Sequence, residues 1–90
     1  MFSVRFRSTR VERELQRLPE QDRSRVMLRL NQLAQDARPQ GIASLDASVY
    51  RLRVGQFRLI YEVDNDAQEI TVLRIARRNA RTYRGLEELF

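Results

Sequence analysis

The stretch that decides the fold is Tyr50-Arg-Leu-Arg-Val-Gly-Gln-Phe-Arg-Leu-Ile-Tyr-Glu-Val63, which predicts two β-strands joined by a tight turn. A Gly-X pair between two alternating apolar runs is typical of a type II′ hairpin turn, and Gly55-Gln56 is such a pair. Because strand side chains alternate between the two faces of a sheet, this turn gives the hairpin one apolar face. That face consists of Tyr50, Leu52, Val54, Phe57, Leu59 and Tyr61.

The opposite face of the same hairpin carries three arginines, Arg51, Arg53 and Arg58. The turn sets Arg53 directly opposite Arg58, and like charges opposed across two strands destabilise a sheet by roughly a few tenths of a kcal/mol. Selection for folding alone gives little reason to keep such a pair, whereas binding of a polyanion does. We therefore expect an open face that binds anions. The alternative is a charged face that only contacts water and binds no partner. Arginine suits phosphate because its planar fork binds two oxygens at once.

The segment before the hairpin predicts one strand followed by two helices. Apolar residues alternate over residues 2–6, which indicates a short, half-buried strand. Thr9-x-x-Glu12 has the spacing of a capping box, so a helix should start near Thr9. Pro19 suits the first turn of a second helix, which should end near Arg38. The buried stripes of the two helices are Val11, Leu15, Leu18, Val26, Leu30, Leu33 and Ala37.

The rest of the chain completes an α+β pattern. Residues 40–48 read as a loop, and residues 69–75 read as a central strand with apolar side chains on both faces. Asp64 and Asp66 would be compatible with a metal, but their place in a polar turn favours a turn role. The predicted order is β-α-α-β-β-β, with the helical hairpin packed on one face of a small antiparallel sheet.

Composition limits the possible functions. The chain has 90 residues, of which 42% are hydrophobic, so we expect a single globular domain over residues 1–90. It has no cysteine and no histidine, which argues against a thiol nucleophile and a zinc site, and we expect no metal and no cofactor. No apolar run approaches the roughly 18 residues of a membrane span, so we expect a soluble, cytoplasmic protein. The net charge is +5, and every basic residue is an arginine. This excess of positive charge indicates an anionic partner, either nucleic acid or an acidic protein.

The segment after the last predicted strand is also rich in arginine. It contains Arg77, Arg78 and Arg81, with Tyr83 among them. The arginines extend the expected anion-binding surface. For Tyr83 two interpretations stay open: its ring packs against the protein, or it stacks on a base or contributes its hydroxyl to chemistry.

The hairpin and the downstream run Ile75-Ala-Arg-Arg-Asn-Ala-Arg-Thr-Tyr83 together resemble the RelE/ParE toxin superfamily of bacterial toxin–antitoxin systems. The resemblance covers nearly the whole chain in element order and is specific between about Leu45 and Tyr83. RelE-like enzymes of this superfamily cleave mRNA in the ribosomal A site, whereas ParE-like proteins poison DNA gyrase. Basic residues on both hairpin strands, an arginine after the last strand and a tyrosine near the C-terminus are the RelE-like set, so the resemblance implies the RelE-like branch.

The resemblance implies roles for these residues. The catalytic residues are Arg58, Arg77 and Tyr83, and the RNA-binding residues are Arg51, Arg53, Arg78 and Arg81. The implied reaction is metal-independent attack of an mRNA 2′-hydroxyl on the adjacent phosphate, leaving a 2′,3′-cyclic phosphate and a 5′-hydroxyl. The implied partners are mRNA, the ribosome and a small acidic, RelB-like antitoxin.

One departure from the family affects the mechanism. RelE has lysines on the first hairpin strand, where this chain has Arg51 and Arg53, and arginine is a poor base because its pKa lies above about 12. Proton removal would then fall to Tyr83, to the ribosome or to water. Two alternatives remain: a gyrase-directed toxin without catalysis, and a catalytically inactive relative that binds RNA or an antitoxin.

Overall fold

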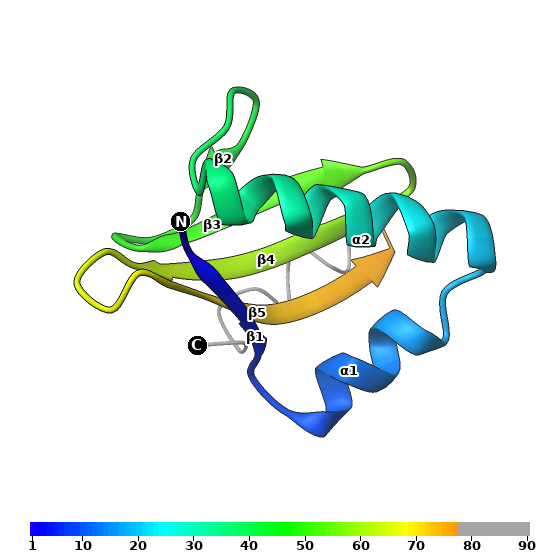
Figure 1. Ribbon diagram of the computed structural model, residues 1–90. Helices are drawn as coiled ribbons and strands as arrows, with labels where there is room; N and C mark the ends of the chain where they lie inside the picture. Colours follow the sequence, from blue (N-terminus) through cyan, green and yellow to red (C-terminus); the bar gives the residue numbers. More distant parts are fainter. Residues whose placement is uncertain (78–90) are drawn as a thin grey trace.

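The computed structural model describes residues 1–77, and over these residues two helices cover one face of a five-stranded sheet (Figure 1). The elements are β1 (Ser3–Phe6), α1 (Thr9–Gln16), α2 (Glu20–Gln35), β2 (Ala43–Ser44), β3 (Val49–Val54), β4 (Phe57–Asp64) and β5 (Glu69–Arg77). The spatial order of the strands is β1-β5-β4-β3-β2. This confirms the α+β class and the helical hairpin on one face of the sheet. Neither of the two helices is long and apolar enough to cross a membrane.

Two details of the sheet differ from the sequence prediction. β2 lies inside the segment expected as a loop, and its two residues pair with Arg51 and Tyr50 of β3. β1 pairs with β5 in parallel, from Ser3 opposite Glu69 to Phe6 opposite Val72, so the sheet is mixed and not purely antiparallel. The reason is topological, because the helical hairpin carries the chain away from β1 to the far edge and the β3–β5 meander returns it beside β1.

The hairpin has the predicted register. Leu52 lies opposite Leu59, and Arg53 lies opposite Arg58. The turn requires a left-handed backbone at its first position, and Gly55 has φ +59° there. The predicted six-residue apolar face is therefore confirmed.

The helix ends follow local backbone chemistry more than the predicted caps. α1 starts at Thr9 as expected, but its N-cap is Ser8 and no side chain caps it, so the predicted capping box does not form. α2 starts at Glu20 with Pro19 as N-cap, and it ends at Gln35, three residues short of the expected end. The earlier end has a cause in Asp36, which is extended (φ −144°) and whose Oδ1 accepts the Arg38 N–H at 3.2 Å.

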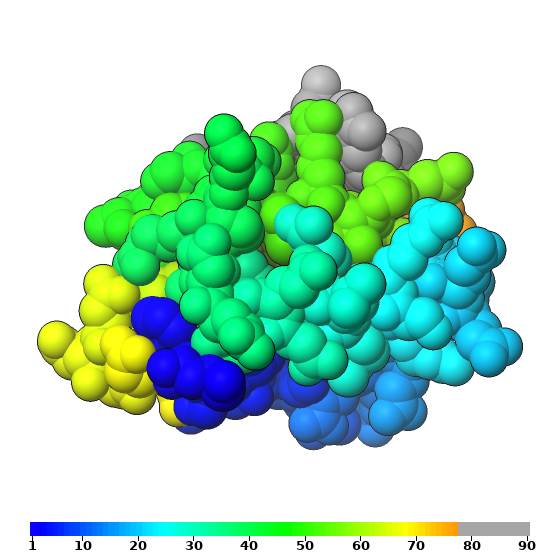
Figure 2. Space-filling model, turned by 45° about the horizontal axis from the view of Figure 1, so that its top comes forward, coloured from blue at the N-terminus to red at the C-terminus, as the bar shows by residue number. Residues whose placement is uncertain are grey.

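The core lies between the helices and the apolar face of the hairpin. Leu59 and Tyr61 are fully buried, and they belong to one cluster with the α1 and α2 stripes. Each large apolar side chain buried in this way contributes about 1.5–3 kcal/mol. Tyr50, expected in the core, is half-buried at its margin. The N-terminal segment closes the same side, because the Phe2 N–H donates to the Ala34 carbonyl at 2.7 Å. Figure 2 shows this segment, in dark blue, between α2 and the yellow β4–β5 turn.

A β-bulge in β5 changes which side chains share a face. Ile60 of β4 lies opposite Arg74 and Tyr61 lies opposite Val72, so Leu73 is an extra residue on β5. Val72 and Ile75 therefore both face the helices, although they are three residues apart. Leu73 faces the other side of the sheet and packs against a second buried cluster of Val49 and Ile60.

Candidate functional site

The candidate site begins with the arginine face, which we define as Arg51, Arg53 and Arg58 on the side of the sheet away from the helices. Arg53 is exposed and Arg51 is half-buried. Arg58 is only 3% exposed, so the expectation of an open Arg58 is wrong. It lies on the central strand β4, between β3 and β5, where strands flank it on both sides. The three arginines share one face as predicted, but they differ greatly in exposure.

An apolar cluster adjoins the arginine face. Ile60 is fully buried although it lies on the side away from the helices, and it pairs with Arg51 across the strands. Val49 and Leu73 complete the cluster, with Leu45 packed against it. The sequence signal for this cluster was the unbroken run Leu59-Ile60-Tyr61, since continuous apolar residues indicate burial on both faces.

A cavity of about 460 Å³ opens on the same side of the sheet, beyond this cluster. Its lining consists of Arg5, Arg7, Asp46, Ala47, Ser48, Val49, Glu62, Thr71 and Leu73. The lining contains two arginines and two carboxylates, so the cavity has no strong net preference for an anion. Sequence reasoning missed it because its walls come from four strands and a loop that are distant in the chain.

Arg77 lies apart from the arginine face. It stands opposite Phe57, and its guanidinium carbon is 5.1 Å from the centroid of that ring. Its Nη1 also lies 3.5 Å from the Gln56 Oε1. Phe57 faces the helices, whereas Arg58 lies opposite Ala76 and faces the other way. The bulge at Leu73 explains this placement, because one extra residue exchanges the faces of every side chain that follows it.

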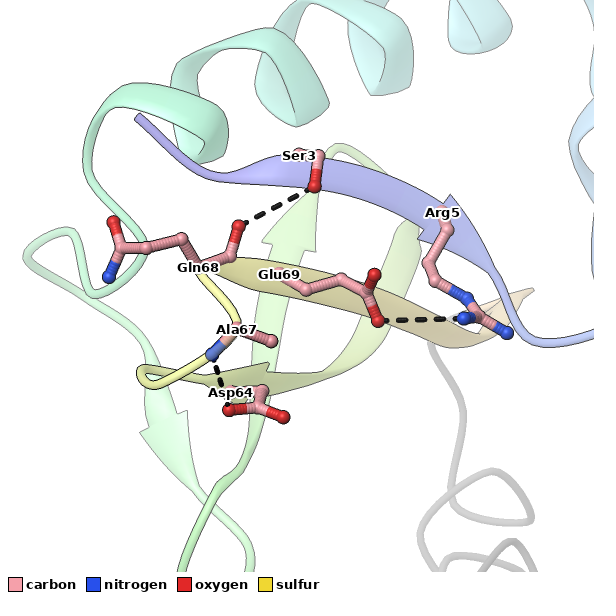
Figure 3. A network of polar contacts seen from close by, with 6 residues as sticks. All are labelled: Ser3, Arg5, Asp64, Ala67, Gln68 and Glu69. Atoms are coloured by element: carbon pink, nitrogen blue, oxygen red, sulfur yellow. Dashed lines mark hydrogen bonds and ion pairs between the residues drawn. The ribbon is translucent and has the colours of Figure 1, made fainter.

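The acidic turn after β4 has the structural role that its sequence indicates. The Asp64 Oδ1 accepts the Ala67 N–H at 3.0 Å, and Figure 3 shows this bond at the tip of the turn. Over residues 1–77, no group of histidine, cysteine, aspartate and glutamate side chains could hold a metal ion. Arg78, Arg81 and Tyr83 lie outside the described residues.

A separate polar network holds the far end of the helix-covered face. The Tyr61 hydroxyl donates to the Ala37 carbonyl at 2.9 Å, just beyond the end of α2. The Arg38 Nε donates to the Tyr50 hydroxyl at 2.9 Å, and its Nη1 donates to the Asn65 Oδ1 at 3.1 Å. Burial raises the pKa of the Tyr61 hydroxyl to about 12, with Tyr50 adding to the rise and Arg38 opposing it. This network joins α2 to the sheet and does not reach the arginine face.

Solved structures with the same arrangement of helices and strands define the class of fold. The archaeal RelE–RelB complex from Pyrococcus horikoshii OT3 matches with a TM-score of 0.76 at 23% identity, over 88% of this chain and 97% of that chain. The RelBE2 toxin–antitoxin complex from Mycobacterium tuberculosis matches with a TM-score of 0.73 at 26% identity, over 86% and 98%. The isolated RelE toxin from E. coli matches over the full length of both chains, with a TM-score of 0.77 at 15% identity. The fold is that of RelE toxins.

The sequence comparison gives the family. The model described as "ParE toxin of type II toxin-antitoxin system, parDE" matches residues 6–81. Because this match spans most of the chain, the protein belongs to the ParE toxin family, within the RelE/ParE superfamily, and is a toxin of a type II toxin–antitoxin system. No curated protein matches the sequence significantly.

Proposed function

We propose that this toxin is a ribosome-dependent endoribonuclease that cleaves translated mRNA in the A site. The observation that carries the proposal is the direct opposition of Arg53 and Arg58 on the sheet face away from the helices. Two arginines that leave one face of the sheet from paired positions suit a phosphodiester, which accepts hydrogen bonds through two oxygens and gains negative charge in the transition state. An mRNA codon extended across this face would meet Arg51 and Arg53 through its phosphates.

In the proposed reaction, the 2′-oxygen forms a bond to phosphorus and the bond to the 5′-oxygen breaks. The products are a 2′,3′-cyclic phosphate and a 5′-hydroxyl, and no metal takes part. Arg58 would stabilise the charge that develops on the phosphate, a contribution typically worth about 2–4 kcal/mol. The arginines stay protonated, so Tyr83, the ribosome or water would remove the 2′-proton.

Two features of the described structure set conditions for this mechanism. Arg58 is 3% exposed, so substrate binding must uncover its guanidinium. Arg77 stacks on Phe57 on the opposite face, so its proposed catalytic role requires it to leave that ring. A surface cation–π contact is worth about 0.5–1 kcal/mol, which binding energy from an mRNA codon can offset. Arg78 and Arg81 are proposed as further RNA contacts.

The proposed regulatory partner is an acidic, RelB-like antitoxin. Relatives of the same fold were crystallised as complexes with RelB antitoxins. The net charge of +5 favours an acidic segment that wraps the domain and neutralises the arginine face. The ribosome, mRNA and antitoxin are cytoplasmic, and we propose that the toxin acts there.

Inhibition of DNA gyrase is the second candidate function. Two observations favour it: the family model is that of ParE toxins, and Arg58 and Arg77 face opposite sides of the sheet. A gyrase-directed toxin needs a binding surface and no catalytic residues. It would therefore not require Arg58 and Arg77 to lie on the same face.

A pair of assays with purified components separates the two functions. In one, the toxin is added to ribosomes programmed with a short mRNA, and the RNA ends are sequenced. In the other, it is added to gyrase and relaxed plasmid, and supercoiling is followed on a gel. We expect cleavage within the A-site codon and unaffected supercoiling. Intact mRNA with blocked supercoiling would assign the protein to the second function.

A further inference from the structure

A second group of arginines lies on α1, away from the arginine face. Arg10, Arg13 and Arg17 are spaced i, i+3 and i+7, which places them along one side of a helix. Arg17 is the C-cap and keeps helical backbone angles, so it continues the same line. All three side chains are exposed. We refer to these three residues as the α1 arginine stripe.

The sequence suggests that Glu14 neutralises this stripe, but the structure shows that it does not. Glu14 lies four residues after Arg10 and three before Arg17, the spacings of helical ion pairs. Its carboxylate instead turns inward to β5: Oε2 accepts the Arg74 Nε at 2.8 Å and Oε1 accepts the Ile75 N–H at 3.0 Å. β1 pairs with β5 only as far as Val72. Beyond that point the Glu14 carboxylate takes the place of a neighbouring strand and accepts the backbone N–H of Ile75. Both of its oxygens are thereby occupied.

No other carboxylate of the described residues compensates the stripe. Glu12 is two residues from Arg10 and adjacent to Arg13, and residues at these spacings do not face each other on a helix. Over residues 1–77 none of the three arginines takes part in an ion pair. Arg13 and Arg17, at i and i+4, repel each other by about 0.2–0.5 kcal/mol. Arg10 also stands in the first turn, where the helix dipole disfavours a cation. Arg13 and Arg17 stand in the last turn and at the C-cap, where the dipole favours a cation, so the unfavourable contributions are the repulsion within the stripe and the position of Arg10.

We propose that the α1 arginine stripe is a second nucleic-acid interface, which binds the phosphate backbone of folded RNA while the arginine face holds the mRNA. The inference rests on the proposed function and deepens it. Val11 and Leu15 pack α1 against one side of the sheet (Figure 1), and the arginine face lies on the other side, so we expect the two surfaces to bind different segments of RNA. A translating ribosome presents such a second RNA segment around its A site.

Arginine forks along a rigid helix suit the phosphates of an RNA backbone. Successive stripe residues are separated by about 4.5 and 6 Å along the helix axis, given a rise of about 1.5 Å per residue. A row of bidentate donors at that spacing fits a regular series of phosphates. Contacts of this kind add affinity that depends steeply on salt, with little influence on a chemical step at another face.

The test compares two double variants with the same loss of charge. Arg10→Gln with Arg13→Gln removes two stripe residues, and Arg23→Gln with Arg25→Gln removes two arginines from α2. Glutamine keeps a helix propensity close to that of arginine, so both variants should fold. Binding to programmed ribosomes is measured over a salt series, and KM and kcat are measured for A-site cleavage.

For the stripe variant we expect KM to rise about tenfold or more, kcat to stay within about twofold, and the slope of log K against log salt to become less steep by about 1.5. The α2 variant should match the unmodified toxin in all three measurements. Equal behaviour of the two variants would overturn the proposal. So would a stripe variant that binds ribosomes normally but loses antitoxin, because the partner would then be an acidic protein. If the unmodified toxin binds ribosomes but cleaves nothing, the proposed function fails, and the salt slopes still decide whether the stripe binds RNA.

Discussion

Arg58 and Arg77 stand at the same end of neighbouring strands but on opposite faces of the sheet. Arg58 lies opposite Ala76, and Arg77 lies opposite Phe57 with its guanidinium over that ring. Strict alternation along β5 from Val72 would have placed Arg77 beside Arg58. The extra residue Leu73 reverses that placement. The two arginines therefore contribute differently to any chemistry on the arginine face.

Substitution of each arginine should reveal that difference. Arg58→Ala should lower the cleavage rate by one to three orders of magnitude, as expected for a lost charge stabiliser worth about 2–4 kcal/mol. Arg77→Ala should lower it less, because Arg77 first has to leave Phe57. Single-turnover cleavage on programmed ribosomes measures both effects. Equal losses in the two variants would mean that Arg77 already reaches the phosphate.

The carboxylate of Glu14 should be important for stability. Glu14→Ala leaves the Ile75 N–H and the half-buried Arg74 without their acceptor, which should cost about 1–3 kcal/mol of unfolding free energy. Glu14→Gln keeps an oxygen for the Ile75 N–H and should cost less. Urea denaturation measures these differences.

Glu69 provides the control at the other end of the same strand. It pairs with Arg5 at 3.5 Å, and that arginine side chain is 60% exposed (Figure 3). Glu69→Ala should therefore cost less than about 1 kcal/mol. A cost equal to that of Glu14→Ala would show that the inward position of Glu14 has no special value.

The raised pKa of the Tyr61 hydroxyl predicts that the protein loses stability at high pH. Its pKa is about 12 in the folded protein, above the value of 10.0 for an unperturbed tyrosine. Between these values the unfolded state releases the proton while the folded state retains it. The free energy of unfolding is therefore unaffected by this proton below about pH 10. Between about pH 10 and pH 12 it falls by about 3 kcal/mol in total. Tyr61→Phe should be less stable at neutral pH by about 1 kcal/mol, because it loses the bond to Ala37. It should also lose most of the alkaline slope, whereas an unchanged slope would assign the titration to another group.

The hairpin turn depends on Gly55. A Cβ at this position would lie 3.4 Å from the Arg25 Nη1, and φ is +59°, where side chains other than glycine are strained. Gly55→Ala should destabilise the protein by about 1–2 kcal/mol. Gly55→Asn should cost less, because asparagine tolerates a left-handed backbone. Thermal unfolding of both variants checks the order, and equal melting temperatures would contradict the assigned turn.

Much of the fold follows from local signals. The Gly55 turn and the alternation around it fix the β3–β4 register, and with it the shared face of Arg53 and Arg58. The exposure of each arginine, in contrast, depends on which other strands lie beside it, and local signals do not reveal that. Arg58 is flanked by strands on both sides, and nothing in its own sequence neighbourhood distinguishes it from the exposed Arg53.

Two other features required the three-dimensional structure. The bulge at Leu73 lies in an apolar run where either face is acceptable, so the alternation does not reveal the extra residue. Glu14 has the spacing of a helical ion pair with Arg10 and Arg17, and only the end of β1 beside β5 explains why it turns inward. These non-local contacts determine the face of Arg77 and the charge of the α1 arginine stripe.

The most direct test of the central claim is to map the 5′ ends of cellular mRNA after brief expression of the toxin. New ends should lie inside translated codons, carry 5′-hydroxyls, and disappear when Arg58→Ala replaces the unmodified toxin at equal abundance. Growth arrest that persists in the Arg58→Ala variant, with intact mRNA and induced DNA damage, would contradict the account and establish a gyrase-directed toxin.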